Sequence, residues 1–415
     1  MQPSASFSRR ITPVRLVALV CAAQVLAQIG AYTWPALLPG FLDRWQLDNS
    51  EAGWITGLFY AAYTLSVPFL VTLTDRVDPK RVYLFGVACT VAGHLTFALI
   101  ADGFWTAALA RVIAGVGWAG TYMTGLKLLA DRVDGRLMSR AVAGHAASIG
   151  IAGAVSFLFA GTLGAWFGWR SAFVAAAGCA AAAWLIALLF APPRERAPAP
   201  AGAALFDFRP VLRNRSAMAY ALAYCVHTWE MNALRGWAVA FLAFIAASLG
   251  DANPWIAPTV VATAMGLIGT WASVAGNELS IRLGRQRVVR FAMAGSILCG
   301  TAIGFLGPLS YTLAAALVLL YGLVIWLDSS SLTAGAAGSA EPERRGATLA
   351  MHSMLGYAGG FVGPLMVGWV LDAAGGMSPT AWGLAFLHVA AVMLLGRIAF
   401  ALLRPRDLAG DRVTA

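Results

Sequence analysis

The sequence predicts an all-α polytopic membrane protein with twelve transmembrane helices, and three observations support this fold class. Hydrophobic residues make up 60% of the 415 residues and charged residues only 12%, far from the composition of soluble domains. The chain divides into twelve apolar runs, each long enough to cross a hydrocarbon core of about 30 Å as a helix. Of the 29 Lys and Arg residues, 25 lie in or next to alternate gaps between these runs, the two chain ends included. Because lipid cannot satisfy an open backbone, the runs are expected to be helical.

The apolar runs follow one another with short polar gaps. They cover residues 16–39, 52–74, 82–101, 104–126, 141–165, 171–191, 217–248, 257–281, 288–306, 309–337, 347–371 and 379–403. The first run is too long for a signal peptide and contains Gln24 and Gln28, so we expect it to be a retained span. Trp34 and Pro35 are expected to kink its outer end.

Basic residues distinguish the two sides of the membrane. They occupy the gap before the first run and every second gap after it, whereas the other gaps hold only Arg44 and Arg170. The positive-inside rule therefore places both termini and the long middle loop in the cytoplasm, and the protein in the cytoplasmic (inner) membrane. The net charge of +10 fits loops that face anionic lipid, so the lipid bilayer and not nucleic acid is the expected partner.

The chain reads as two related halves. Residues 192–215 are rich in Pro, Ala and Arg and keep no helical apolar stripe, so they predict a linker between an N-terminal six-helix bundle (1–191) and a C-terminal one (216–415). When His145 is placed on His352, the glycines at 153 and 161 fall on those at 360 and 368 without gaps. Similarity at half-chain distance is typical of a duplicated transporter fold with its site between the repeats.

Three motifs resemble those of the major facilitator superfamily. Residues 75–81 (DRVDPKR) resemble its signature between the second and third spans, with Asp78 and Pro79 in place of a glycine and a basic residue. Residues 111–117 (RVIAGVG) and 168–173 (GWRSAF) match two further signatures. The resemblance covers nearly the whole chain and implies twelve helices in two pseudo-symmetric six-helix bundles that work by alternating access.

The same resemblance implies a set of gating residues. Asp75 would hold the two halves together in one state, and a helix N-terminus is a suitable acceptor site for its carboxylate. The set consists of Asp75, Arg76, Arg81, Arg282, Arg287, His145 and His352. The two histidines, at matching positions, are equally well explained as packing residues.

Glycines are concentrated in the runs 141–165 and 347–371, which predicts close and sliding helix contacts. The superfamily's antiporter signature has a Gly-Pro step in the fifth span. That step is absent from 141–165, although Gly363 and Pro364 occur in 347–371, which argues against a drug/proton antiporter.

Polar residues inside apolar runs are candidates for a binding site, because buried polar groups in a membrane are costly. In the resembled fold the first, fourth, seventh and tenth spans line the cavity. The substrate-binding candidates on these spans are Gln24, Gln28, Tyr32, Arg111, Trp118, Tyr122, Tyr224, His227, Met231, Asn232, Arg235 and Trp326. Hydrogen bonding between packed helices is the alternative explanation for such residues.

Two carboxyl groups are candidates for proton coupling. Glu230 is the leading candidate, because burial favours the uncharged form of a carboxyl group and so allows it to bind a proton, and Asp328 is a second buried acid. Either arginine of the candidate set, Arg111 or Arg235, is a suitable partner for Asp328, and the sequence leaves the pairing open.

The leading hypothesis is a secondary active transporter, a monomer, that moves a small polar and anionic solute by proton coupling or exchange. Efflux of amphipathic compounds is one alternative, and copper import is another, because His227 and Met231 share a helical face. No P-loop, HExxH motif or nucleophile elbow occurs, so neither an enzyme, a cofactor nor a bound metal is expected.

Overall fold

The computed structural model describes residues 12–74, 76–133, 135–193, 208–251, 253–341, 344–406, 408 and 411. Over this part of the chain all regular structure is helical. Eleven spans within it are long and apolar enough to cross a membrane, each formed by one helix or by joined helices. The predicted all-α polytopic fold is confirmed.

The predicted run 104–126 is the one that does not appear among these eleven spans. A break at Gly120 and Thr121 divides it into α5 (Phe104–Ala119) and α6 (Tyr122–Ala130), and Arg111 lowers its hydropathy. The twelfth span is therefore present as two shorter helices, neither of which crosses a membrane alone.

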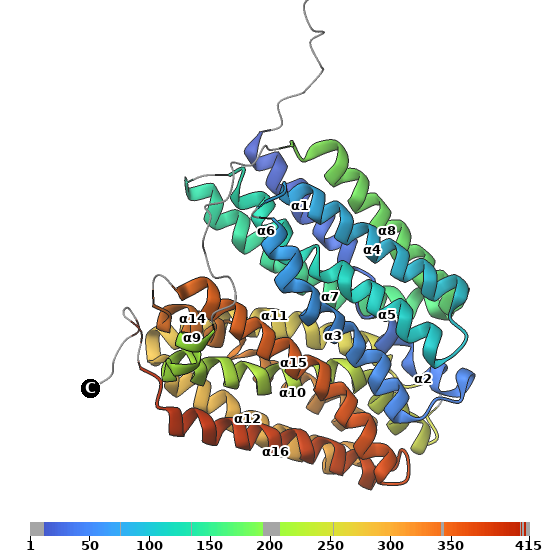
Figure 1. The fold of residues 1–415 in the computed structure, drawn as a ribbon. Helices are drawn as coiled ribbons and strands as arrows, with labels where there is room; N and C mark the ends of the chain where they lie inside the picture. Colours follow the sequence, from blue (N-terminus) through green and yellow to red (C-terminus); the bar gives the residue numbers. More distant parts are fainter. Residues whose placement is uncertain are drawn as a thin grey trace, which may run out of the picture.

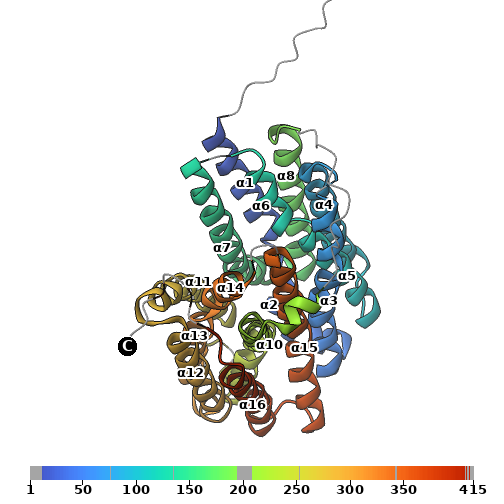
Figure 2. The same ribbon diagram turned by 60° about the vertical axis from the view of Figure 1, so that its left-hand side comes forward.

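The helices form two groups, in the upper and lower parts of Figure 1 and again separate in Figure 2. The first group consists of α1 (Pro13–Gln28), α2 (Thr33–Trp45), α3 (Asn49–Leu73), α4 (Pro79–Ile100), α5, α6, α7 (Gly135–Phe167) and α8 (Trp169–Phe190). The second group consists of α9 (Arg209–Arg213), α10 (Arg215–Ser248), α11 (Pro258–Leu283), α12 (Arg285–Leu306), the 3-10 turn Gly307–Leu309, α13 (Tyr311–Trp326), α14 (Ser329–Ser339), α15 (Arg345–Ala373) and α16 (Pro379–Leu403).

The helices of each group run between two ends of the molecule, the linker end and the distal end. The linker end carries residues 74, 76–79, 130–133, 135, 283–285, 339–341 and 344–345, together with residues 191 and 208. The distal end carries residues 46–48, 168 and 374–378. Residues 194–207 lie outside the described residues, so the domain boundaries remain a prediction, and α9 is a short helix that the sequence did not predict.

Local sequence signals explain where helices begin. Asp48 caps α3 in a capping box, because its carboxylate accepts from the Glu51 backbone at 2.7 Å and the Glu51 carboxylate accepts from the Asp48 backbone at 3.1 Å. Ser310 and Ser378 are the N-caps of α13 and α16, and each side chain accepts a hydrogen bond from a backbone N–H in the first turn. The chain bends at residues 29–32, and Pro35 follows in the first turn of α2, where a missing N–H costs nothing.

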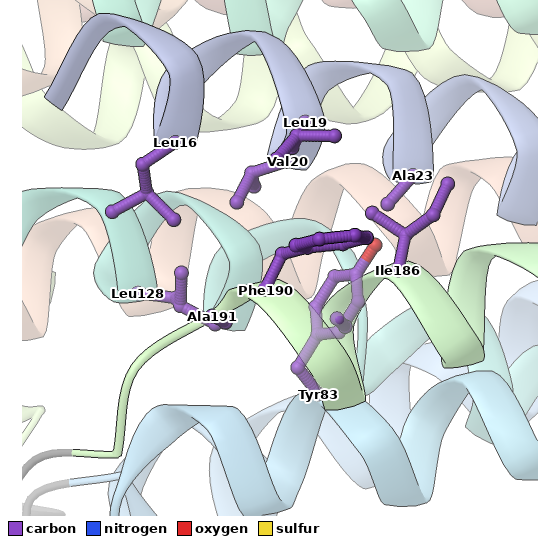
Figure 3. A pocket seen from close by; sticks show the side chains of 10 residues that line it. Leu16, Leu19, Val20, Ala23, Tyr83, Leu128, Ile186, Phe190 and Ala191 are labelled. Carbon is purple, nitrogen blue, oxygen red and sulfur yellow. The ribbon is translucent and has the colours of Figure 1, made fainter. Parts of the chain in front are cut away.

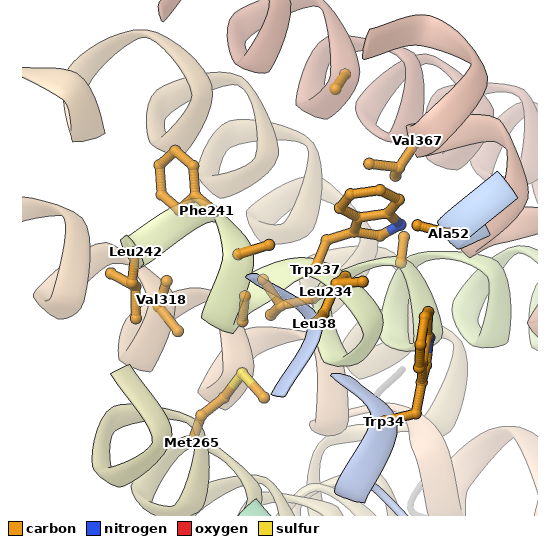
Figure 4. Packing of buried hydrophobic residues seen from close by; sticks show 14 of the residues in the cluster. Trp34, Leu38, Ala52, Leu234, Trp237, Phe241, Leu242, Met265, Val318 and Val367 are labelled. Atoms are coloured by element: carbon orange, nitrogen blue, oxygen red, sulfur yellow. The ribbon is translucent and has the colours of Figure 1, made fainter. Parts of the chain in front are cut away.

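The two groups pack on each other through three helix pairs: α3 with α15, α7 with α11, and α2 with α10. A continuous buried cluster crosses this boundary (Figure 4). Trp34 of α2 belongs to it together with Trp237 of α10 and Val367 of α15. The Trp237 indole also donates to the carbonyl of Pro364 at 2.8 Å. Apolar burial therefore holds the groups together in this conformation.

The internal repeat extends to the positions where helices break. In the first group α5 ends at residue 119 and α6 begins at residue 122. In the second group α13 ends at residue 326 and α14 begins at residue 329. These positions are 207 residues apart, as are His145 and His352. Residue 121, a threonine, thus corresponds to Asp328. The predicted pseudo-symmetry is seen in the backbone itself.

Candidate functional site

Three of the four predicted cavity helices are interrupted, at residues 29–32, 120–121 and 327–328, while α10 is continuous. Broken helices are typical of transporter binding sites, because freed backbone groups and helix ends face the site. In the first group, the Gln28 amide donates to the Thr121 hydroxyl at 2.8 Å and so joins two breaks. The Gln24 side chain is fully buried, and neither of its polar atoms has a partner within the described structure.

Two arginines from different groups converge on the break between α1 and α2. Arg111 of α5 donates to the Ala31 carbonyl at 3.3 Å, and its guanidinium lies 4.1 Å from the centre of the Phe59 ring. Arg235 of α10 donates to the Tyr32 hydroxyl at 2.9 Å. Neither arginine forms an ion pair with any described acidic residue. Two buried or half-buried cations therefore meet at the boundary between the groups, and no described acidic residue balances their charge.

Aromatic rings surround these cations. The Arg235 guanidinium lies 4.6 Å from the centre of the Trp326 ring and 5.2 Å from that of Tyr32. Tyr32 stacks on Phe157 and meets Trp118 edge to face. The Trp118 indole N–H is buried and has no partner in the described part of the chain. Of the predicted residues, the structure thus gathers Tyr32, Arg235, Trp326 and Trp118.

The two candidate acids lie elsewhere, which resolves the pairing that the sequence left open. Glu230 is buried within the second group and accepts from the Tyr321 hydroxyl at 2.7 Å. Asp328, at the break between α13 and α14, lies 2.8 Å from Nδ1 of His227. Neither carboxyl group pairs with Arg111 or Arg235, so the positive charge of the arginines stays available.

His227 begins a row of stacked rings in the second group. It stacks on Tyr224, with ring centres 5.6 Å apart, and Tyr224 stacks on His352 at 4.0 Å. His352 reaches the Thr333 hydroxyl at 3.1 Å. Asn232 donates to the Thr228 carbonyl within α10, and Met231 is half-buried, so neither joins this row.

The counterpart histidine of the first group has different contacts. His145 reaches the backbone carbonyl of Tyr122 at 2.9 Å, and the two rings stack. His145 and His352 thus contact residues of their own groups, and their proposed gating role stays a prediction.

The remaining gating candidates lie at the linker end. Asp75 falls outside the described residues. Arg76, Arg81 and Arg287 are exposed, and Arg282 pairs with Glu278 at 2.7 Å on the surface. None of these described contacts joins the two groups.

Two ion pairs at the linker end were missed by the sequence analysis. Arg132 pairs with Asp78 at 2.8 Å, and Arg285 forms two hydrogen bonds with Asp411, both among nearly buried side chains. Asp78 had been noted only as a departure from a motif. Its partner follows a different helix, and no spacing in the sequence connects them.

The distal end carries an inter-group contact that the sequence did not reveal. The Asp372 carboxylate, at the end of α15, accepts four hydrogen bonds from the first two residues of α3. The Asn49 backbone and side chain donate at 3.1 and 2.7 Å, and the Ser50 backbone and hydroxyl donate at 2.7 and 2.6 Å. A carboxylate at a helix N-terminus is also favoured by the helix dipole. We call this contact the distal latch.

Glycines allow the backbones to meet beside the latch, as the glycine-rich runs predicted. A Cβ at Gly368 would overlap the carbonyl oxygen of Asn49. A Cβ at Gly53 would lie 2.9 Å from the Leu365 Cα atom. Contact along α3 and α15 is thus backbone to backbone at the distal end.

A small pocket within the first group is not suited to a solute. It has a volume of about 10 Å³ and is lined by apolar side chains of α1, α6 and α8 together with Tyr83 (Figure 3). The Tyr83 hydroxyl is buried without a partner in the described structure. Such a volume is about that of one water molecule.

Comparison with known sequences gives a consistent family. The profile of the Major Facilitator Superfamily matches residues 20–334. Protein spinster homolog 1 of Homo sapiens is 23% identical over 384 residues, covering 86% of this chain and 72% of that protein. The uncharacterized MFS-type transporter YfnC of Bacillus subtilis is 34% identical over 141 residues, covering 33% of this chain and 30% of that protein.

Solved structures share the fold. A bacterial homolog of the human lysosomal transporter Spinster, in an inward-facing and unoccupied conformation, matches with a TM-score of 0.73 and 15% identity over 94% of this chain and 95% of that one. The nucleoside transporter NupG matches with a TM-score of 0.74 and 16% identity over 94% and 98%. At these identities the likeness concerns the architecture.

Proposed function

The chain belongs to the Major Facilitator Superfamily, and we propose that it is a proton-coupled or exchanging transporter of a small anionic solute. A role as a secondary transporter of small solutes follows from the family. The anionic solute is our inference, and one observation carries it. Arg111 and Arg235 meet at the break between α1 and α2, and no described carboxylate neutralises them.

The geometry supports a carboxylate or a similar planar anion. Arginine offers several N–H donors in a fixed fork, which matches the oxygens of such an anion. Tyr32 and Trp326 hold the Arg235 guanidinium in place, and Arg235 is only half-buried, so it keeps access to a ligand. Fixing a donor before the ligand arrives reduces the entropy cost of binding.

We further propose that Asp328 and His227 carry the coupling proton. Asp328 lies at a helix break two residues from Trp326, which itself contacts Arg235. Protonation of this pair would therefore act next to the cation that meets the solute. Glu230 is the second candidate, but Tyr321 already satisfies one of its oxygens inside the second group.

Orientation and location are part of the proposal. The alternating pattern of basic residues supports a cytoplasmic linker end and a location in the cytoplasmic membrane. The distal latch then closes the outer side. Nothing specific favours copper import, since His227 faces Asp328.

Thermal unfolding of the detergent-purified protein tests the solute class. Lactate, succinate and a nucleoside monophosphate serve as anionic probes, and a lipophilic cation serves as the contrast. A ligand that binds only the folded protein stabilises it by RT ln(1 + [L]/Kd). We expect an anion to raise the midpoint and Arg235→Ala to abolish the effect. Arg170→Ala is the matched control, because Arg170 stacks on Trp169 at the distal end. Stabilisation by the cation alone would overturn the proposal in favour of efflux.

Transport in proteoliposomes tests the coupling site. Using the anion that stabilises the protein, we expect Asp328→Asn to abolish accumulation driven by a pH gradient and to retain solute exchange at equal pH. Glu230→Gln should keep gradient-driven accumulation. The reverse pattern would assign the proton to Glu230.

A further inference from the structure

A hollow of about 730 Å³ lies at the linker end of the second group, away from the site described above. Its walls come from three segments that are distant in the sequence: residues 210 and 213–216, residues 338–341, and residues 403, 404, 406 and 408. Figure 1 shows α9 and α14 at this end of the second group, where α9 packs on α10 and α15.

Hydrogen bonds fasten these walls together. The Asn214 amide donates to the Ser339 carbonyl at 2.8 Å. The Ser216 hydroxyl accepts from the Arg406 backbone at 2.9 Å, and Arg215 donates to the Leu402 carbonyl at 3.4 Å. The hollow is thus a built feature of the fold where the start of α10 meets the ends of α14 and α16.

Its charge is strongly positive. Four arginines line it: Arg213, Arg215, Arg404 and Arg406. None of the four forms an ion pair with a described acidic side chain, and Glu341 is the one carboxylate among the described lining residues. Elsewhere at this end, Arg132 and Arg285 are each paired with an aspartate. Four arginines without an ion pair to a described residue, around one hollow, form a site for an anion with several oxygens, and phosphate fits this geometry.

Exposed apolar side chains at positions next to lining residues indicate how a ligand would be oriented. Leu402, near the end of the membrane-spanning α16, is 68% exposed, and Leu212 of α9 is 56% exposed. A soluble phosphate ester has no apolar chain that could pack on these leucine side chains. A phospholipid carries its phosphate next to acyl chains, and basic pockets at the cytoplasmic surface bind such headgroups.

We propose that this hollow binds the headgroup of an anionic phospholipid, with the phosphate among the four arginines. The site is separate from the solute site and does not depend on it. A lipid bound there would bridge α10, α14 and α16, all of which belong to the second group.

The test uses the full-length protein in a neutral detergent, with thermal unfolding followed as phosphatidylglycerol or phosphatidylcholine of the same acyl chains is added. We expect phosphatidylglycerol alone to stabilise the protein, less so at high salt. In Arg213→Gln/Arg406→Gln, its apparent affinity should fall by about 30-fold, since each arginine near a charged membrane surface contributes about 5-fold. Neither side chain makes a described hydrogen bond, so folding should not suffer.

A matched control and two contrary outcomes make the test decisive. Arg140→Gln/Arg290→Gln removes two exposed arginines from the same end, outside the hollow, and should leave the affinity unchanged. Equal stabilisation by both lipids, or equal loss in both double variants, would overturn the proposal. Stabilisation by glycerol 3-phosphate without any effect of phosphatidylglycerol would assign the hollow to a soluble phosphate and also overturn it.

Discussion

Removal of the Asp372 carboxylate is expected to open the distal end. In the structure this group accepts four hydrogen bonds from Asn49 and Ser50 across the boundary between the groups. Because water replaces part of each bond on opening, the latch contributes roughly 2–4 kcal/mol to closure. Asp372→Ala should therefore shift the equilibrium between closed and open distal ends between about 30-fold and about 1,000-fold toward the open form.

Distances between spin labels measure this shift. One pair of labels at positions 43 and 373 reports on the distal end, and a second pair at positions 140 and 290 reports on the linker end. In Asp372→Ala we expect the distal distance to lengthen and the linker distance to shorten, because alternating access closes one end as the other opens. Asp372→Asn, which keeps one acceptor oxygen, should have an intermediate effect.

Asp102→Ala is the control for this experiment. Asp102 lies at the distal end of the first group and bonds to Thr106 of the same group. It should leave both distances unchanged. If the distances in Asp372→Ala equal those of the parent protein, the latch does not determine the conformation and the reasoning is refuted.

Two further predictions concern stability and closure. Gly368→Ala should block distal closure and slow transport, because the new Cβ would meet the backbone oxygen of Asn49; normal transport by this variant would show that α3 and α15 can separate at no cost. Tyr321→Phe should lower the free energy of unfolding by about 1–3 kcal/mol, because it removes the donor to the buried Glu230, and thermal unfolding measures the change. Tyr311→Phe, whose hydroxyl donates to a backbone carbonyl near the surface, should cost less, and an equal loss in both would contradict the assignment.

The sequence was sufficient for the fold and for part of the candidate site. Apolar runs and alternating basic gaps predict helices because the membrane imposes one solution on the backbone. The repeat offset taken from His145 and His352 also locates the matching helix breaks. Periodicity along α10 placed Arg235 among the candidates, since residues on one face of a helix recur at fixed spacing.

Contacts between distant segments could not be predicted. Asp372 and Asn49 are 323 positions apart, and nothing in the sequence near either residue indicates the other. The pairing of Asp328 with His227, and not with an arginine, depends on side-chain directions at a helix break. The sequence pattern identifies which polar residues are costly to bury, but only the packed structure shows which partner forms a hydrogen bond or ion pair with each of them.

The matching helix breaks have a consequence for the history and working of the molecule. Duplication gave both halves the same hinge, but the hinge of the first half holds an uncharged pair, Gln28 and Thr121, where the second holds His227 and Asp328. The backbone is therefore pseudo-symmetric, whereas the pair of titratable side chains at the helix break occurs in the second group alone. In the coupling that we propose, a proton bound at Asp328 and His227 changes the charge of the second group alone, so a proton gradient acts on the rocking motion through that group.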